Sequence, residues 1–352
     1  MFALLAVGQR VDLDKFYFNA NYRELPHAPL DTSYRTFSVS IDAGALTRMS
    51  VKEDLMQQEL YIGGWKKLSA NGHIQVNLKM EDVIVEKSDI KERVEIIKDK
   101  NGKEVGQKKH YYMELTYSYG ARAIISDYRG NLLSNTLLMS RDSKHTHTSS
   151  EYDSKLEAQV FFAYNVIPVT SELSRQVVYS VLRNISEKMT YSYGFSQRTV
   201  NDFMWILDNR KHAEFPGHQQ AWLTIKQALF QMNADEPLDQ VREMVKPAIE
   251  YFEKVKKMYS GSSKNDRKMR YASYYNLSKL YYYLDDYNAA MREATSLVLN
   301  DFDARDGRML EGWANDLKWT LQQNKFTSRH FPINIDQLAG PNVGTGAAAS
   351  SK

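Results

Sequence analysis

Alternation of apolar and polar residues marks the first half of the chain as β-rich. The alternating rows are Phe37–Ile41, Ile74–Met80 and Tyr111–Tyr119. Successive side chains of a strand point to opposite faces of the sheet, so each row predicts a strand with one buried face. The phase changes after Asp82, which predicts a β-bulge there.

Glycine-containing turns separate these rows. Asn101-Gly102 follows a β-type run that ends at Lys98, and Gly130 follows another that ends at Ile125. Asn and Gly both tolerate the positive φ of tight hairpin turns, so the pattern predicts a mainly antiparallel sheet. The charged segment 92–109 is expected to be a long, solvated hairpin arm whose charges discourage edge-to-edge pairing.

The period changes to that of a helix near Thr170. Leu173, Val177, Val181 and Ile185 follow at four-residue spacing, which predicts an amphipathic helix that ends near Met189. Pro168 is expected to lie before its start. The helix should pack on one face of the sheet. A shorter helix or an irregular strand is expected over 51–61.

These patterns predict an α+β protein with two domains. A β-rich domain of antiparallel hairpins and a packed C-terminal helix should span 10–195, and an all-α domain should span 196–335. The final segment 336–352 has little apolar content, which predicts a disordered tail.

One motif in the second half has a recognisable form. Segment 271–302 resembles a tetratricopeptide repeat, with Asp285-Asp286-Tyr287 at the turn between its two helices. Three positions depart from the usual motif, where Ser278 replaces glycine, Ala294 replaces an aromatic residue and Phe302 replaces proline. The matching positions are Tyr274, Leu277, Ser278, Tyr281, Ala290, Ala294 and Leu297.

A single repeat cannot bury its own apolar face, so neighbouring repeats are expected. Segment 218–258 resembles a weaker repeat, and segment 309–321 looks like a capping helix. Helical repeats present a concave groove, so the resemblance implies binding of a partner protein. Tyr283 lies about 200° around the helix from Tyr281 and should face away from the packing stripe. The predicted groove residues are Lys226, Asn276, Lys279 and Tyr283.

Composition narrows the class of protein. The 352 residues include 12% aromatic side chains, which support a large core, and no cysteine. The lack of cysteine excludes disulfides, thiol nucleophiles and Cys-type metal sites. With 46 basic and 43 acidic residues, the net charge of +3 is too balanced to indicate a nucleic-acid partner. No apolar run reaches the ~18–20 residues of a membrane-spanning helix.

Two histidine clusters are candidate metal sites. His145 and His147 would share a face on a strand, but the surrounding sequence favours an exposed polar loop. Segment 210–218 contains His212 and His218, yet Pro216-Gly217 breaks the helical spacing of a zinc motif. The chain also lacks G-x-S-x-G, P-loop and G-x-G-x-x-G motifs. No catalytic residue, metal or cofactor is therefore predicted.

The N-terminal residues suggest where in the cell the protein is located. The apolar run Phe2–Val7 followed by Gly8-Gln9 resembles the end of a signal peptide, so 1–9 is interpreted as a possible signal-peptide remnant. A buried strand or short helix is the alternative. Export to the periplasm, or association with the outer membrane, is expected, and a cytoplasmic location is the alternative.

The combined expectation is a non-enzymatic scaffold in a bacterial cell-envelope complex. It would bind a partner protein and could associate peripherally with a membrane complex. The alternative is a glycan-binding or glycoside hydrolase-like protein, whose tyrosines and tryptophans would serve as sugar platforms. Such an enzyme would need two carboxylates about 5–10 Å apart in a cleft.

Overall fold

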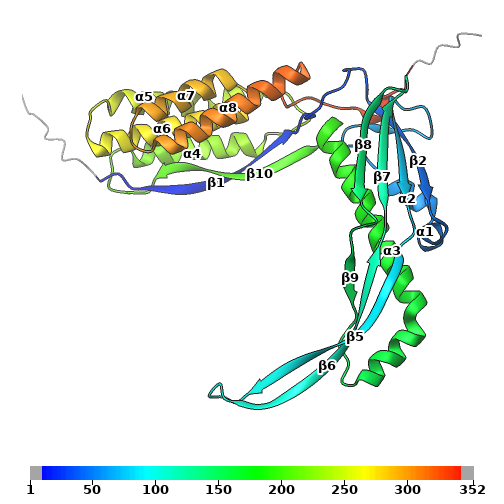
Figure 1. Ribbon diagram of the computed structural model, residues 1–352. Coiled ribbons are helices and arrows are strands. Elements are labelled where there is room, and N and C mark those ends of the chain that lie inside the picture. The colour runs from blue at the N-terminus through cyan, green and yellow to red at the C-terminus, as the bar shows by residue number, and fades with distance from the viewer. Residues whose placement is uncertain (1–9, 342–352) are drawn as a thin grey trace, which may run out of the picture. The chain divides into compact units, whose positions relative to one another are not determined.

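The computed structural model describes residues 10–341 and confirms the α+β class. The described chain forms two compact units (Figure 1). Residues 10–29 and 192–334 make up the helical unit, and residues 30–191 and 335–341 make up the sheet unit. This division corrects the predicted one, because residues 10–29 belong with the helices and not with the sheet. The proposed signal-peptide remnant, 1–9, lies outside the described residues.

The sheet unit is built on five strands in the order β3-β2-β4-β7-β8. β2 runs parallel to β3 and β4, whereas β4–β7 and β7–β8 are antiparallel. The parallel pairs are possible because α1 (Ala45–Ser50) and α2 (Glu53–Glu59) form a crossover between β2 and the next strands. The strands are β2 (Thr36–Ala43), β3 (Lys66–Lys67), β4 (Ile74–Met80), β7 (Ala121–Asp127) and β8 (Leu132–Met139).

A second sheet of the same unit forms the predicted arm. β5 (Ile84–Lys98) and β6 (Glu104–Ser118) make a long hairpin, and β9 (His145–Thr148) pairs with β6. The phase change after Asp82 falls between β4 and β5, so the bulge expected there is wrong, and the β5–β6 ladder shifts register further on, between Val85 and Lys87. At the hairpin turn the Asp99 carboxylate accepts hydrogen bonds from the backbone N–H groups of Asn101 and Lys103, at 2.8 and 3.0 Å. In this turn Gly102 has positive φ and Asn101 does not, so the expectation that both residues would adopt positive φ is wrong for Asn101.

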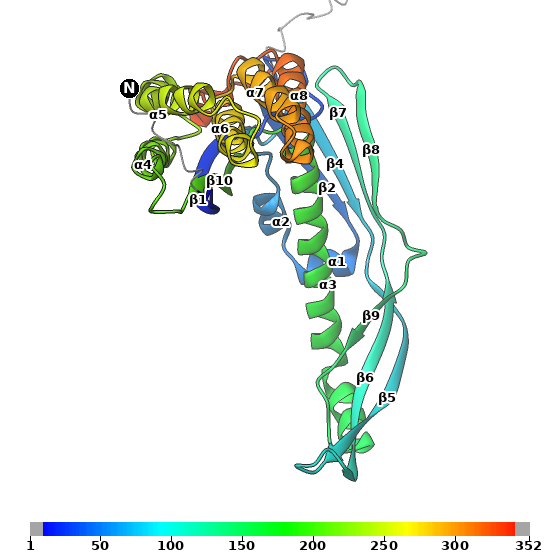
Figure 2. The same ribbon diagram turned by 90° about the vertical axis from the view of Figure 1, so that its left-hand side faces the viewer.

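Helix α3 (Lys155–Tyr193) is longer than its sequence predicts. It begins well before Pro168, which lies inside it, so the expected start near Thr170 is wrong. A proline costs a helix one hydrogen bond without excluding it, and the segment around it is strongly apolar. From Leu173 onward α3 buries the predicted stripe, and it runs along the five-stranded sheet (Figure 2).

The helical unit combines a two-stranded ribbon with five helices. β1 (Leu13–Arg23) pairs antiparallel with β10 (Gln197–Leu207), and Leu13 lies opposite Leu207. β10 was assigned to the all-α domain, although Val200, Met204 and Ile206 follow a strand period. The helices are α4 (Phe215–Phe230), α5 (Asp239–Met258), α6 (Lys264–Tyr283), α7 (Tyr287–Leu299) and α8 (Ala304–Asn324).

The helices of this unit pack against their neighbours, as expected of helical repeats. α6 and α7 join at the predicted turn, where Asp285 has φ 61° and the Asp286 carboxylate caps α7 by accepting the Ala289 N–H at 2.9 Å. Ala290 is buried at the contact between these helices. One core contains side chains of the ribbon, such as Phe18 and Ile206, together with side chains of α4, α5 and α6.

Segment 336–341 of the predicted tail is ordered by the sheet unit. Its first two residues belong to a 3-10 helix, η1 (Ile335–Gln337). The Asp336 carbonyl accepts a hydrogen bond from the Lys66 ammonium at 2.7 Å. The expectation of disorder is therefore wrong for this part, and 342–352 lies outside the described residues. Within residues 10–341, no helix is long and apolar enough to cross a membrane.

Candidate functional site

The β1–β10 ribbon lies against the face of α6 that was predicted to be an open groove. Asn276 of α6 binds the edge of β10, where its side-chain amide accepts the Trp205 N–H and donates to the Trp205 carbonyl, both at 2.8 Å. The amide thus satisfies the two backbone groups that a third strand would have bonded. Asn276 is fully buried by this contact.

Lys279 and Tyr283 bind the same strand through a carboxylate. The Lys279 ammonium donates to Asp202 Oδ1 and to the Phe203 carbonyl, and the Tyr283 hydroxyl donates to Asp202 Oδ2 at 2.7 Å. Burial lowers the pKa of Lys279, although the nearby Asp202 charge opposes that shift. Burial, followed by the Asp202 charge, raises the pKa of Tyr283. The carboxylate therefore links two buried side chains of α6 to β10.

Three of the four predicted groove residues are therefore buried, and their expected exposure is wrong. Asn276, Lys279 and Tyr283 are 0%, 1% and 3% exposed. The helical period placed them off the α6–α7 contact, but the period cannot show that a ribbon from the same chain covers that face. Lys226 is exposed on α4, as predicted.

A cleft remains open where the ribbon meets α6 and α8. Its volume is about 400 Å³. Tyr283 lies in its lining, and the Trp313 and Tyr282 rings meet with centroids 5.5 Å apart. We call this feature the ribbon cleft. Its lining residues are Tyr22, Arg198, Val200, Asn201, Asp202, Tyr282, Tyr283, Trp313 and Asp316.

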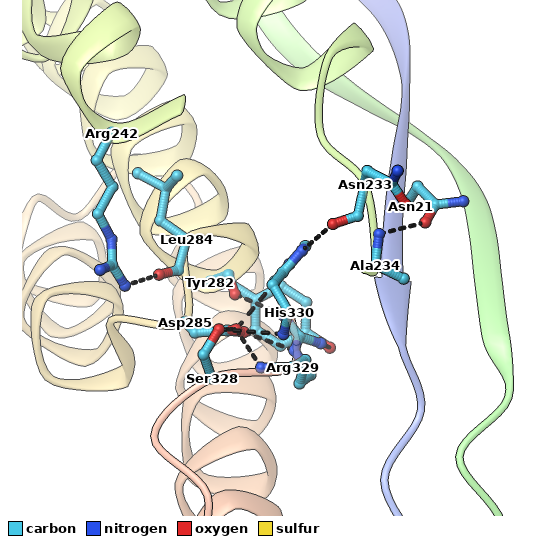
Figure 3. A network of polar contacts seen from close by, with 10 residues as sticks. All are labelled: Asn21, Asn233, Ala234, Arg242, Tyr282, Leu284, Asp285, Ser328, Arg329 and His330. Carbon is cyan, nitrogen blue, oxygen red and sulfur yellow. Dashed lines mark hydrogen bonds and ion pairs between the residues drawn. The ribbon is translucent and has the colours of Figure 1, made fainter. Parts of the chain in front are cut away.

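A buried ion pair supports the aromatic wall of the ribbon cleft (Figure 3). Arg329 donates through Nε to Asp285 Oδ1 at 2.6 Å and through Nη2 to the Tyr282 carbonyl at 2.7 Å. Its guanidinium also stacks 4.2 Å from the Tyr22 ring centroid and 4.7 Å from that of Tyr282. Burial alone lowers the pKa of Arg329, but the Asp285 charge and other partners outweigh it, so this pKa is raised.

The segment that carries Arg329 is held at further points. The Ser328 hydroxyl donates to Asp285 Oδ2 at 2.9 Å, and His330 Nδ1 lies 2.9 Å from the Asn233 carbonyl oxygen (Figure 3). Arg242 donates to the Leu284 carbonyl at 2.8 Å, next to the Asp285 turn. These hydrogen bonds fix the position of Arg329, and Arg329 in turn packs against the Tyr22 and Tyr282 rings.

Some charged residues of the ribbon cleft have partners within the chain, and others are exposed. Asp202 is bound by Lys279 and Tyr283, and Arg198 forms an ion pair with Glu24. Asp316 is exposed on α8. Because Asp202 neutralises a buried ammonium, its negative charge helps to hold the ribbon on α6. The arrangement offers aromatic rings and the exposed Asp316 carboxylate to a ligand, and the Lys279 ammonium lies 5.4 Å from the Trp313 ring centroid.

The two histidine clusters have local structural roles. His145 and His147 lie on strand β9 and not in the expected loop, and the His145 ring packs 5.4 and 5.3 Å from those of Tyr117 and Tyr119. His212 Nδ1 accepts the Glu214 N–H at 3.1 Å, and His218 is fully buried. Within residues 10–341, no group of three or more His, Cys, Asp or Glu residues could hold a metal ion.

His218 should make the stability of the helical unit depend on pH. Burial lowers its pKa to about 3, whereas an unfolded histidine titrates near ~6.5. Below that pH the unfolded chain binds a proton that the folded chain does not, so stability is lost as the pH falls from 6.5 toward 3. Between pH 7.5 and 5 the expected loss from this residue is about 2 kcal/mol.

The measurement is urea unfolding at a series of pH values for the native chain and His218→Phe. Phenylalanine matches the edge-on packing of His218 against Tyr251 and Phe252, and it removes one long hydrogen bond, from the Leu207 N–H to His218 Nδ1 at 3.4 Å. The other titrating groups are common to both proteins and cancel in the comparison. The variant should lose stability less steeply below pH 6.5, and identical slopes would contradict the assignment.

Sequence reasoning missed most of the residues that form the ribbon cleft. Trp313 lies within segment 309–321, which was expected to be a capping helix, and Asp202 and Arg198 were not singled out. The alternation of Val200, Met204 and Ile206 was a signal for β10, and with it for the outward-facing residues between them. No protein-family profile matches this chain, and no curated protein is significantly similar to it.

Proposed function

We propose that the protein is a non-enzymatic interaction component that binds a segment of a partner protein in the ribbon cleft. The observation that carries this proposal is a pair of aromatic rings, Trp313 and Tyr282, that line a cleft of about 400 Å³, with Tyr282 held by the buried Arg329–Asp285 ion pair. Aromatic side chains held rigidly in a pocket are typical of binding hot spots. On this proposal the helices are a degenerate tetratricopeptide-like array.

The chemistry of the cleft favours a cationic side chain of the partner. The exposed Asp316 carboxylate lies in the same lining as Trp313 and can pair with a cation, whereas the Trp313 and Tyr282 rings already have the Lys279 and Arg329 cations of this chain at 5.4 and 4.7 Å from their centroids. An arginine could direct its guanidinium toward Asp316 in a bidentate contact. The preferred ligand is therefore an extended, arginine-containing segment.

The cellular setting is part of the same proposal. The apolar run Phe2–Val7 followed by Gly8-Gln9 supports export, and we place the protein in a cell-envelope complex, in the periplasm or against the outer membrane. N-terminal sequencing of the native protein tests this placement. A mature chain that starts near residue 9 or 10 supports it, and intact Met1 in a cytoplasmic fraction contradicts it.

A glycan is the second candidate ligand, because ring faces and two carboxylates, Asp202 and Asp316, share the cleft. A retaining or inverting glycosidase needs one carboxyl group to donate a proton. Both oxygens of Asp202 instead accept hydrogen bonds, from Lys279 and Tyr283, so this carboxylate is already engaged within the chain. The structure therefore gives more support to glycan binding than to glycan hydrolysis.

The test is capture of partners from the native host with three forms of the full chain. Trp313→Ala should reduce capture at least tenfold, as expected of a hot-spot residue worth about 2 kcal/mol or more. Trp319→Ala is the matched control, because Trp319 is on the same helix but packs against His27, at a centroid distance of 5.6 Å.

Asp316→Arg separates binding from folding. Asp316 is exposed, so the reversal of its charge should leave the melting temperature nearly unchanged while it weakens capture of a cationic partner. Undiminished capture by both Trp313→Ala and Asp316→Arg would contradict the proposed site. If capture is lost on treatment of the lysate with glycosidases, the ligand is a glycan.

A further inference from the structure

Backbone groups of the β1–β10 ribbon alternate between bonding across the ribbon and facing its outer edges. The two strands are antiparallel, so residues that exchange backbone hydrogen bonds alternate with residues whose N–H and C=O groups point outward. The even-numbered residues bond across. At one end of the ribbon the Asp208 N–H donates to the Asp12 carbonyl at 2.9 Å, and at the other the Glu24 N–H donates to the Ser196 carbonyl at 2.8 Å. The odd-numbered residues therefore face outward.

Side chains of α6 already bond two of the outward positions of β10. Asn276 bonds both backbone groups of Trp205 at 2.8 Å, and the Lys279 ammonium donates to the Phe203 carbonyl at 3.1 Å. Trp205 and Phe203 are odd-numbered, in agreement with the alternation. These side chains of α6 thus replace a neighbouring strand along this half of the edge.

The next outward positions along β10, Asn201 and Thr199, have no such partner. The ribbon has two strands, so no strand lies beside this edge. Within residues 10–341, no side chain or loop bonds the backbone N–H or C=O group of either residue. Their side chains bond Asn19 and Asn21 of β1 instead, at 2.9 and 3.0 Å. Free backbone groups at a sheet edge are a template for another strand.

The open part of the edge borders the ribbon cleft. Arg198, Val200 and Asp202 are even-numbered, so their side chains share one face of the ribbon, and all three line the cleft. A strand added beside β10 would place every second side chain on that same face. Those side chains would enter the cleft, whose lining also includes Trp313 and Asp316.

We propose that the partner segment adds to the ribbon as a third strand, paired with β10 at Thr199 and Asn201. This inference rests on the proposed function and specifies how the segment is held. Main-chain hydrogen bonds to the edge supply affinity, and an arginine on the cleft side supplies selectivity through Asp316. The part of β10 that α6 does not bond, 197–201, is about 17 Å long at ~3.4 Å per residue, so a segment of about five residues fills it.

The outer edge of β1 suits an added strand less well. The Arg23 N–H, an outward group of β1, already donates to the Arg329 carbonyl at 3.1 Å. The side chain of Asn21 accepts the Ala234 N–H at 2.9 Å, so the loop that follows α4 lies against this strand. Among the described residues that line the ribbon cleft, Tyr22 alone belongs to β1.

A synthetic peptide tests the backbone pairing on the native chain. The probe is a capped seven-residue peptide of alternating threonine and valine, with arginine in place of the central valine. Threonine and valine favour extended strands. We expect a Kd of about 1 mM or below, measured by fluorescence anisotropy of a labelled copy.

Two derivatives of this peptide carry N-methyl groups on alternate amides, one derivative for each set of amides. In an added edge strand only one set of N–H groups faces β10. One derivative should therefore bind at least about tenfold more weakly than the other, which should keep the affinity of the unmodified peptide.

Proline variants test the same hydrogen bonds from the side of the protein. Asn201→Pro removes an outward N–H of β10 and no donor of the β1–β10 ladder, and it should weaken peptide binding by about fivefold or more. Asn19→Pro is the matched control, because Asn19 lies opposite Asn201 and both variants lose the side-chain bond between them. It should leave the affinity within about twofold of the native value.

The outcomes separate this inference from the proposed function. Equal affinities of the two methylated peptides, or equal effects of the two proline variants, would overturn the third strand. If Trp313→Ala and Asp316→Arg weaken peptide binding in that case, the ribbon cleft still binds the arginine and only the backbone pairing is wrong. If the unmodified peptide fails to bind at several millimolar, the inference and the proposed ligand are both wrong.

Discussion

Arg329→Met is expected to lower the free energy of unfolding of the helical unit by about 3–5 kcal/mol. The Asp285 carboxylate is completely buried, and the Arg329 side chain supplies its charge partner and one hydrogen bond, while the bond from the Arg329 backbone N–H would remain in the variant. Without the guanidinium, the carboxylate would be a buried charge with no counter-charge on that side. The measurement is urea unfolding followed by circular dichroism and tryptophan fluorescence.

Two companion variants identify the cause of this loss. Arg305→Met breaks the exposed Arg305–Asp303 pair and should change stability by less than about 1 kcal/mol. Asp285→Asn combined with Arg329→Met removes the buried charge, and asparagine tolerates the positive φ at this position, so part of the stability should return. If Arg329→Met costs no more than Arg305→Met, the network does not support the ribbon cleft as described.

Lys279→Met should be the second large effect, at about 3 kcal/mol or more. It leaves Asp202 without its ammonium partner and removes a cation stacked 4.2 Å from the Phe203 ring centroid. Because Asp202 lies on β10, the loss should loosen the ribbon before the helices, which hydrogen exchange of the β1–β10 amides can detect.

Lys226→Met is the matched control for this prediction. Both lysines were predicted to face one groove, but Lys226 is exposed on α4 and its replacement should stay within about 0.5 kcal/mol. Equal, small effects of the two replacements would show that Lys279 is solvated and that the ribbon does not cover α6.

The elements that the sequence predicted well are those set by local patterns. β4, the two glycine turns and the α6–turn–α7 hairpin follow from period and turn chemistry, which act over a few residues. The pairing of β1 with β10 joins segments about 180 residues apart, as the Asn21–Thr199 hydrogen bond shows. No local pattern encodes that pairing, so residues 10–29 were assigned to the wrong unit.

The same long-range pairing explains the errors at the site. The helical period of α6 predicted a solvent-facing groove for Asn276, Lys279 and Tyr283, because a polar side chain off the packing stripe usually means solvent. Here each polar group has a buried partner on β10, which a helical wheel cannot reveal. Pro168 misled in the opposite direction, because α3 continues through this helix-breaking residue although Ile167 beside it is 78% exposed.

A site-specific photo-cross-link in the native host tests the central claim most directly. A benzophenone amino acid at position 316 would stand in the ribbon cleft, whereas the same group at Lys318 would lie about 200° away around α8. We predict a covalent adduct with a discrete partner from position 316 and little or none from position 318. No adduct at 316, or equal adducts at both positions, would contradict the assignment of the ribbon cleft as the binding site.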